Sequence, residues 1–179
     1  MSDIELVKSC LRVIPDFPIK GIMFQDIFPI FQNPEAVEAM VSHFVNHIKE
    51  SNPNGVDAIV GLDARGFLFG PMIAVRLGCM FVPIRKKGKL PGNTYVAQYK
   101  KEYGVDEFEI PADALKENQN VIIVDDLIAT GGSAAAAGDL VKKCKANVKE
   151  YLFIIDLVDL KGSSSLSAPV YSMITVHGD

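Results

Sequence analysis

Two adjacent carboxylates followed by small and hydroxyl-bearing residues form the stretch of this sequence best suited to chemistry. Residues 121–133 read VIIVDDLIATGGS, and the alanine run 134–137 follows directly. The apolar start predicts a buried parallel strand, and the alanines predict a helix. We expect Asp125 and Asp126 to close the strand, and the glycine pair that follows to form a tight loop into the helix.

The parts of this stretch suit different portions of one ligand. The N-terminus of a helix favours an anion, and Thr130 and Ser133 add hydroxyl donors. Ser133 also suits a helix cap. Adjacent carboxylates can accept hydrogen bonds from neighbouring sugar hydroxyls, which predicts a phosphorylated pentose. The predicted ribose and 5-phosphate residues are Asp125, Asp126, Ala129, Thr130, Gly131, Gly132 and Ser133. The alternative is a plain strand–turn–helix with solvated acids, although adjacent negative charges are costly unless they are used.

A second, basic group of residues suits a more highly charged ligand. Arg65 follows another predicted strand, Asp57–Leu62, and a compact basic run contains Arg85, Lys86 and Lys89. Glycines and a proline flank that run, so it predicts a shaped loop. A pyrophosphate needs several donors and a counter-cation, usually Mg²⁺ carried in with the ligand. A solvated surface patch is the alternative.

Other phosphate and metal sites fit the sequence poorly. A Walker A loop needs a lysine after its last glycine, but Ser133 follows Gly132 directly. A dinucleotide fingerprint needs two glycines separated by one residue, and the chain has none. His43 and His47 lie one helical turn apart without an evident third ligand, which favours two exposed helix histidines. We therefore predict no dedicated protein ligand for a metal.

Composition indicates a soluble, cytoplasmic protein of one domain spanning residues 1–179. The chain has 49% hydrophobic and 22% charged residues and a net charge of −4. This charge argues against a nucleic-acid or membrane-surface partner. No apolar run approaches the ~20 residues of a membrane span, and no signal peptide is evident. Three widely spaced cysteines predict reduced thiols and no structural zinc.

The order of the predicted elements indicates the fold class. Strands that alternate with helices predict an α/β fold, with a mostly parallel twisted sheet flanked by helices and ligands at the strand C-termini. Polar alternation from about residue 93 to 110 predicts a hairpin or flap. The predicted helices cover about 3–13, 33–50, 66–77 and 133–144, and the predicted strands cover about 57–62, 81–84, 121–124, 151–158 and 169–176.

Several motifs together resemble a known family. VIIVDDLIATGGS resembles the phosphoribosyl-diphosphate (PRPP) binding motif of the type I phosphoribosyltransferases. Over nearly the full chain, the sequence is similar to the adenine phosphoribosyltransferases. The further matching segments are Phe17–Pro18, Gly21–Ile27, Gly61–Pro71, Ile84–Gly92 and Glu102–Gly104.

The resemblance implies a Mg²⁺-dependent enzyme of purine salvage that converts adenine and PRPP to AMP and pyrophosphate. It implies a cytosolic homodimer with the type I phosphoribosyltransferase fold. It also implies a small N-terminal hood over about residues 1–33 and a flexible hairpin flap over about residues 93–110.

The resemblance also assigns individual residues. Glu102 is the expected general acid or base, and Tyr103 would help position the pyrophosphate and ribose. Asp63 and Ala64 would join Arg65 at the pyrophosphate through a non-proline cis peptide. The expected adenine residues are Met23, Phe24, Gln25 and Ile27, with Met23 and Gln25 using backbone groups. Gln25 departs from the arginine common in the family, and a backbone contact would make that change small.

Two other functions remain open. A 6-oxopurine phosphoribosyltransferase would perform the same sugar chemistry on a different base. A non-catalytic PRPP-sensing regulator would need a partner-binding element, and the sequence contains no basic helix-turn-helix segment or appended domain. A panel of adenine, hypoxanthine and guanine separates these functions.

Overall fold

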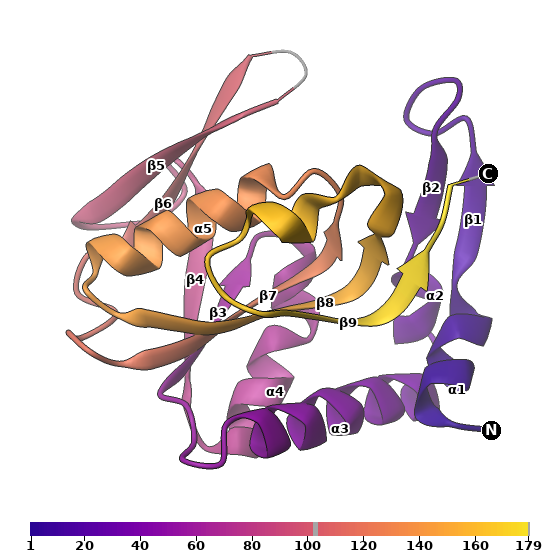
Figure 1. Cartoon of the computed structure of the whole chain (residues 1–179), viewed down its shortest axis with the longest axis horizontal. Coiled ribbons are helices and arrows are strands. Elements are labelled where there is room, and N and C mark those ends of the chain that lie inside the picture. Colours follow the sequence, from indigo (N-terminus) through magenta and orange to yellow (C-terminus); the bar gives the residue numbers. More distant parts are fainter. Residues whose placement is uncertain (102–103, 179) are drawn as a thin grey trace. The chain divides into compact units, whose positions relative to one another are not determined.

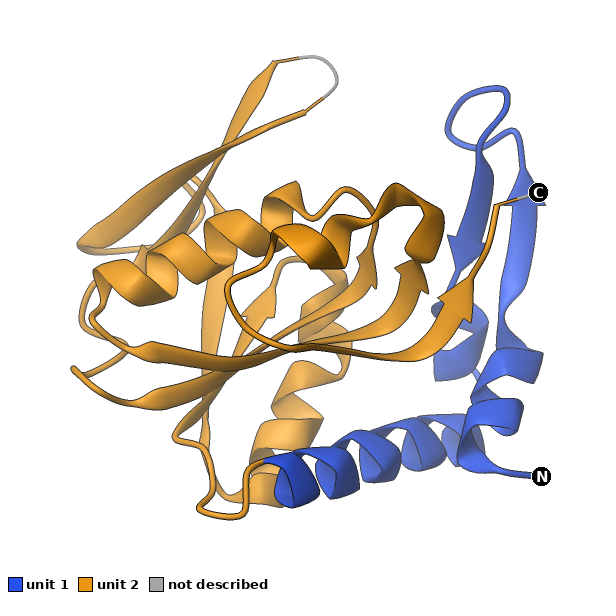
Figure 2. Ribbon diagram, viewed as in Figure 1, with its two compact units in different colours: residues 1–51 blue, residues 52–179 orange. Residues whose placement is uncertain are grey.

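The computed structural model describes residues 1–101 and 104–178, and the chain divides into two compact units (Figure 2). Unit 1 is Met1–Ser51, and unit 2 is Asn52–Asp179. Unit 1 consists of helices and a two-stranded hairpin, whereas unit 2 contains the large sheet.

Unit 1 begins and ends with well-capped helices. Its elements are α1 (Asp3–Cys10), β1 (Arg12–Pro15), β2 (Met23–Asp26), α2 (Phe28–Phe31) and α3 (Pro34–Ser51). At α1, Ser2 Oγ accepts the Glu5 N–H at 3.3 Å and Glu5 Oε2 accepts the Ser2 N–H at 2.7 Å, which is a capping box. The predicted start of α3 is confirmed, because Asn33 Oδ1 accepts the Glu35 N–H at 3.1 Å.

The predicted first helix is too long. It was expected to reach Val13, but it ends at Cys10, and the following residues form β1, paired antiparallel with β2. A proline disfavours helical backbone in the residue before it, so Pro15 draws this segment into an extended conformation. An ion pair of 2.6 Å between Arg12 and Asp26 then fastens the two strands at their paired ends.

Unit 2 is built on a seven-stranded sheet in the order β5-β6-β4-β3-β7-β8-β9 (Figure 1). Five strands, from β4 to β9 in that order, pair in parallel, and the β5–β6 hairpin pairs antiparallel beside β4. This confirms the predicted mostly parallel α/β sheet. The strands are β3 (Ala58–Leu62), β4 (Met80–Lys86), β5 (Thr94–Lys100), β6 (Val105–Pro111), β7 (Asn120–Ile128), β8 (Asn147–Leu157) and β9 (Val170–Val176).

Two helices flank the sheet on opposite faces (Figure 1). They are α4 (Gly70–Leu77) and α5 (Gly132–Lys143), and short 3₁₀ helices lie at η1 (Arg65–Leu68), η2 (Val158–Leu160) and η3 (Gly162–Ser165). Gly78 ends α4 in the left-handed conformation, with φ of 68°, which confirms the predicted stop. Within the described residues, no helix combines the length and apolar character needed to cross a membrane.

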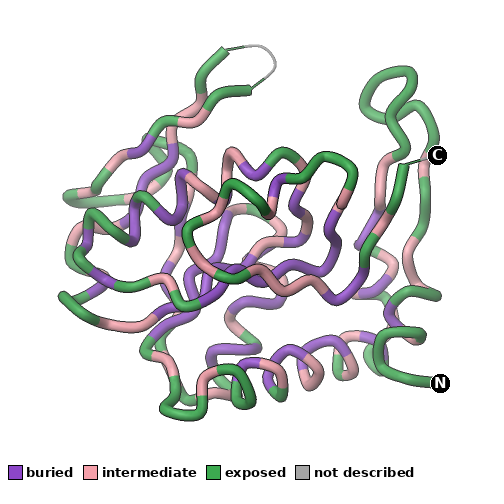
Figure 3. Tube along the Cα trace, viewed as in Figure 1, coloured by how far each residue is buried: buried purple, intermediate pink, exposed green. Residues whose placement is uncertain are grey.

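The strand order creates one special position in the sheet. The chain leaves β3 through α4 to reach β4 on one side, and it leaves β7 through α5 to reach β8 on the other. Ligands in such sheets bind outside the carboxyl ends of the two strands where the connections diverge. Those strands are β3 and β7. Figure 3 shows this centre of the sheet as buried, whereas the described end of the β5–β6 hairpin is exposed.

Three strands are longer than predicted. The acids Asp125 and Asp126 do not close β7, which continues to Ile128 because it still pairs with β8 there. Strand β8 begins at Asn147 rather than Tyr151, where polar residues hid the strand pattern. Strand β4 extends to Lys86 because Arg85 and Lys86 pair with β6. Two basic residues predicted in a loop therefore lie at a strand end.

Candidate phosphate-binding site

The carboxyl ends of β3 and β7 bring two of the predicted loops together. Pairing between these strands stops at Gly61 opposite Val124. Asp125 is thus the first residue of β7 after its pairing with β3 ends. The loop that starts at Asp63 leaves the sheet at the same edge. A Cβ on Gly66 would lie 2.8 Å from the carbonyl oxygen of Val124. Only glycine permits that approach, so η1 packs directly against β7.

An ion pair joins the two loops. Arg65 Nε lies 2.8 Å from Asp126 Oδ2, and the Asp126 side chain is buried. The predicted pyrophosphate arginine is therefore fixed to one of the predicted ribose acids. This contact spans residues from two separate strand ends, so only the sheet topology brings them together.

The neighbouring acid, Asp125, has a raised pKa. Burial and, second, the negative charge of Asp126 raise the pKa of Asp125 well above its ordinary value, and Arg65 opposes this in part. Asp125 Oδ1 accepts the Asp126 N–H at 2.9 Å. Such adjacent carboxyl groups, one paired and one with a raised pKa, suit a ligand that offers two neighbouring hydroxyl groups.

The predicted phosphate loop leads straight into α5. Gly131 caps the helix in the left-handed conformation, with φ of 85°, and its carbonyl accepts the Ala135 N–H at 2.9 Å. The prediction that Ser133 caps the helix is wrong, because Ser133 lies inside its first turn. The backbone freedom of Gly131 starts the helix two residues earlier. The first N–H groups of a helix have no partner within it, so this end is suited to a phosphate.

A residue that the sequence did not single out supports this loop from behind. A Cβ on Gly162 would lie 2.7 Å from the Gly131 nitrogen and 2.8 Å from the Thr130 carbonyl carbon. A Cβ on Gly131 would in turn lie 2.5 Å from the Gly162 carbonyl oxygen. The two backbones touch without side chains between them. The only sequence signal was a run of small residues, 162–165, at the start of η3.

The second loop contains the expected non-proline cis peptide. The bond between Asp63 and Ala64 is cis, as the family resemblance predicted. Arg85 binds this loop, because its Nε donates to Asp63 Oδ2 at 2.8 Å. Its Nη1 donates to the Lys89 carbonyl at 3.0 Å. Arg85 therefore bridges the loop after β3 and the basic loop after β4.

The side chain of Lys86 points to the hairpin. Lys86 Nζ lies 3.4 Å from Asp106 Oδ2, which also pairs with Lys101 Nζ and accepts the Tyr99 hydroxyl at 3.2 Å. The lysines lower the pKa of Asp106, with the hydrogen bond from Lys101 as the largest cause. Burial first, and Asp106 second, raise the pKa of Tyr99 to about 12. Asp106 was not predicted, and it ties the basic loop to the flap.

Two of the predicted residues, Glu102 and Tyr103, lie outside the described residues. The predicted adenine residues belong to unit 1, where Met23, Phe24 and Gln25 lie on β2 and Ile27 precedes α2.

Within unit 1, β2 carries an aromatic contact and an exposed apolar side chain. The Phe24 ring meets the Phe17 ring edge-on, with centroids 5.0 Å apart, and Met23 is exposed. An apolar strand with an exposed side chain and an edge-on aromatic pair is compatible with the wall of a slot for a flat ring.

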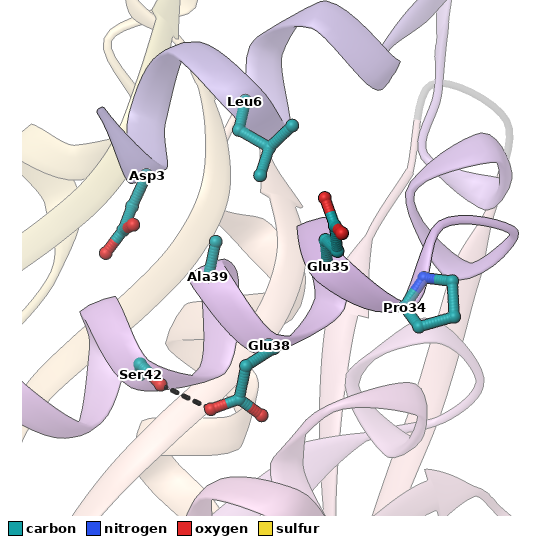
Figure 4. Close-up of a pocket in the computed structure, with 7 residues that line it drawn as sticks. All are labelled: Asp3, Leu6, Pro34, Glu35, Glu38, Ala39 and Ser42. Carbon is teal, nitrogen blue, oxygen red and sulfur yellow. Dashed lines mark hydrogen bonds between the residues drawn. The ribbon is translucent and has the colours of Figure 1, made fainter. Parts of the chain in front are cut away.

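One pocket lies within unit 1, between α1 and α3 (Figure 4). Its volume is about 500 Å³, and Ser42 Oγ donates to Glu38 Oε1 at 2.8 Å at its edge. The pocket is lined by Asp3, Leu6, Pro34, Glu35, Glu38, Ala39 and Ser42. Three acids and no base line it, so it is unsuited to a phosphorylated ligand.

This chain has counterparts among known proteins. Residues 30–171 match the family model of the phosphoribosyl transferase domain. The adenine phosphoribosyltransferase of Yarrowia lipolytica is 55% identical over 94% of this chain and 93% of its own length. The adenine phosphoribosyltransferase of Rattus norvegicus is 45% identical over 97% of both chains.

Solved structures show the same likeness in three dimensions. Adenine phosphoribosyltransferase from Saccharomyces cerevisiae, complexed with an imino-altritol bisphosphate and adenine, superposes with a TM-score of 0.95. It is 51% identical and covers 96% of this chain and 98% of its own. The Trypanosoma brucei enzyme, in complex with AMP, pyrophosphate and ribose-5-phosphate, superposes at 0.88 with 29% identity, covering 98% of this chain and 80% of its own.

Proposed function

The chain belongs to the adenine phosphoribosyltransferase family, and we propose that it forms AMP and pyrophosphate from adenine and PRPP at the β3–β7 edge. The reaction is a pentosyl transfer of purine salvage. The observation that carries this assignment is the meeting of two loops at the point where the sheet connections diverge, joined by the Arg65–Asp126 ion pair.

The β7 side of the edge is suited to the sugar phosphate. Asp125 and Asp126 would accept the two ribose hydroxyls. The loop Ala129–Ser133 and the N-terminus of α5 would hold the 5-phosphate through backbone N–H groups and hydroxyls. Because Gly131 and Gly162 fix this loop by backbone contact, its donors are in place before the ligand arrives.

The β3 and β4 side is suited to the pyrophosphate. Asp63, Ala64 and Arg65 would present backbone and guanidinium donors, and Arg85, Lys86 and Lys89 would surround the leaving group with positive charge. Tyr103 would complete the set. Support comes from the contacts of Arg85, which holds the two loops together through Asp63 and the Lys89 carbonyl.

Mg²⁺ fits this edge as a companion of the ligand. Within residues 1–101 and 104–178, no three His, Cys, Asp or Glu side chains gather to hold a metal. Asp63 and Asp126 each have an oxygen bound to an arginine. We therefore expect the ion to be held mainly by PRPP oxygens, and when bound it supplies neutralising charge to the pyrophosphate.

Glu102 is the residue proposed to move the proton. Positive charge grows on the ribose as the pyrophosphate leaves, and adenine must lose a proton as its nitrogen bonds to the sugar. A carboxylate carried over the site by the β5–β6 flap can accept that proton and return it in the reverse reaction. Closure of the flap would also keep water away from the reacting carbon.

Adenine is proposed to lie against β2. Met23 and Gln25 would contact the base through backbone groups, and Phe24 and Ile27 would supply apolar wall. This assignment is supported by the relatives' high identity and by the aromatic character of β2. Because the proposed contact of residue 25 uses its backbone, the glutamine side chain should be compatible with it.

We further propose that the enzyme is a homodimer in the cytoplasm. The three cysteines are free, which suits a reducing compartment. In unit 2, Met72, Val75 and Met80 are exposed, with 80% of Val75 accessible, and such apolar groups are commonly buried between subunits. Sedimentation equilibrium should give about twice the 19.5 kDa chain mass, and the chain mass itself would contradict a dimer.

A panel of bases tests the function. The protein is incubated with PRPP and Mg²⁺ and with adenine, hypoxanthine or guanine in turn, and pyrophosphate release is measured. We expect release with adenine and little with the other two bases. Preference for hypoxanthine or guanine would indicate a 6-oxopurine enzyme. PRPP binding without release on any base would indicate the PRPP-sensing regulator.

A further inference from the structure

We propose that Glu109, a buried acid on β6, is the positioning residue that shapes the pyrophosphate loop. This loop is the segment Lys87–Gly92, directly after β4. The inference rests on the proposed function, because it assigns to Glu109 the task of holding Arg85 and Lys89 ready for the leaving pyrophosphate. Glu109 itself touches no proposed ligand, so it acts through the backbone of the loop.

The hydrogen bonds of Glu109 reach the middle of the loop and the start of the next strand. Glu109 Oε1 accepts the N–H groups of Lys89 at 3.1 Å and Leu90 at 2.8 Å. Its Oε2 accepts the hydroxyl of Thr94 at 3.2 Å, at the first residue of β5. One carboxylate therefore fastens the loop to the strand that follows it.

Burial makes this arrangement specific for a carboxylate. Only 4% of Glu109 is exposed, and a buried charge is costly unless hydrogen bonds compensate for it. Three donors converge on its two oxygens, and two of these donors are backbone N–H groups that cannot rotate away. A glutamine would keep one acceptor oxygen for the two N–H groups, but it would lose the negative charge that strengthens these bonds, and its NH2 group would have to face the Thr94 hydroxyl.

Glu109 forms one end of a chain of contacts that reaches the cis-peptide loop. Lys89 is held from both sides, because its N–H binds Glu109 and its carbonyl accepts from Arg85 Nη1 at 3.0 Å. Arg85 Nε then donates to Asp63 Oδ2 at 2.8 Å. Arg85 and Glu109 also face each other in the β4–β6 pairing. The two loops proposed for pyrophosphate thus share one hydrogen-bonded frame.

Glu107 provides a matched control on the same strand. Its side chain pairs with Lys87 Nζ at 2.8 Å and accepts from Gln98 Nε2 at 3.0 Å, so both of these contacts are with other side chains. The bond from the Lys87 N–H to the Glu107 carbonyl, at 3.0 Å, uses the backbone and is kept in a side-chain variant. Glu107→Gln removes the same charge from β6 two residues away. The two variants therefore remove the same charge, but only Glu109→Gln changes a side chain that binds the backbone of the loop.

The reverse reaction separates a positioning role from general damage. With AMP and Mg²⁺-pyrophosphate as substrates, Glu109→Gln should raise KM for pyrophosphate about tenfold or more, because it replaces charge-assisted bonds to the loop with weaker neutral ones. KM for AMP, which uses the β7 side, should stay within about twofold. Glu107→Gln should leave both constants near the wild-type values. Equal constants for the two variants, or a parallel rise of both KM values in Glu109→Gln, would overturn the proposal.

Two further measurements keep the proposal testable if the variant folds poorly or the base assignment fails. In the wild-type protein, the amide hydrogens of Lys89 and Leu90 should exchange slowly for loop residues, and exchange as fast as in an open loop would overturn the anchoring. Direct calorimetric binding of Mg²⁺-pyrophosphate to wild type and Glu109→Gln needs no turnover. A tenfold difference there supports Glu109 even if adenine is not the base, whereas equal affinity overturns it.

Discussion

The backbone contact behind the phosphate loop allows a sharp perturbation by a single methyl group. Gly162→Ala would place a Cβ 2.7 Å from the Gly131 nitrogen and 2.8 Å from the Thr130 carbonyl carbon. Both neighbours are backbone atoms, so no side chain can rotate to make room. Either the loop or the η3 segment must shift to restore an ordinary van der Waals distance.

The cost of this shift should appear in ligand binding as well as in stability. Overpacking of this kind costs about 1–3 kcal/mol. If all of this energy is lost from the binding of a ligand to the displaced loop, the affinity for that ligand falls about five- to 150-fold. PRPP and AMP should both bind more weakly, since both carry the 5-phosphate. Pyrophosphate should bind almost as it does to wild type.

Calorimetry with each ligand and chemical denaturation measure these effects. Ser164→Ala is the matched control, because it lies in the same η3 segment and loses only the bond from its hydroxyl to the Lys161 carbonyl. We expect that control to change stability by less than about 0.5 kcal/mol. If Gly162→Ala bound PRPP and AMP like wild type, the Gly131–Gly162 contact would not set the position of the loop.

The remaining predictions concern the carboxyl groups. Glu102→Gln should lower turnover about a hundredfold or more with PRPP affinity nearly intact, and unchanged turnover in a steady-state assay would reject its catalytic role. Asp125→Ala and Asp126→Ala should each weaken PRPP binding about tenfold or more, and normal calorimetric affinity in both would remove the ribose assignment. Because the folded-state pKa of Asp125 is raised above 3.8, folding favours its protonated form. This contribution to stability is present below pH 3.8 and is lost as pH rises through the raised pKa. Asp125→Asn should therefore unfold at higher denaturant than wild type at neutral pH; equal midpoints at every pH would contradict the raised pKa.

The local chemistry of the site was readable from the sequence because each part has a strong local signal. The run Val121–Val124 predicts its own burial, and the glycine pair and alanines that follow predict a loop and a helix. The structure confirms the strand, the loop and the helix, and it places them at the predicted edge. The sequence predicted Ser133 as the cap of α5 because hydroxyl side chains commonly cap helices, but Gly131 occupies that position in the left-handed conformation.

Contacts that depend on strand register could not be predicted from the sequence. The Arg65–Asp126 ion pair joins residues 61 positions apart, and it exists because β3 and β7 are neighbours whose pairing ends at Val124. Glu109 looked like one of several hairpin acids, and only the fold shows that it is buried while Glu107 is partly exposed. The two acids lie on the same face of β6, so the strand pattern does not distinguish them, and the difference comes from the loop bound to Glu109 through Lys89 and Leu90.

The hairpin of unit 1 was missed for a different reason. Strands β1 and β2 have four residues each, too few for a period-two pattern to stand out from a helical one. Their connection contains a cis Phe17–Pro18 bond, and Asp16 Oδ1 accepts the Gly21 N–H at 2.7 Å. Proline and glycine in this segment predicted a turn, but not the pairing that the turn permits.

The central claim is that this chain joins adenine to the ribose of PRPP. Isotopically labelled adenine, PRPP and Mg²⁺ are incubated with the purified protein, and AMP and pyrophosphate are quantified over time. We expect labelled AMP to appear with one pyrophosphate for each AMP, and no product when PRPP is omitted. The absence of labelled AMP from a folded protein that binds PRPP would contradict the claim.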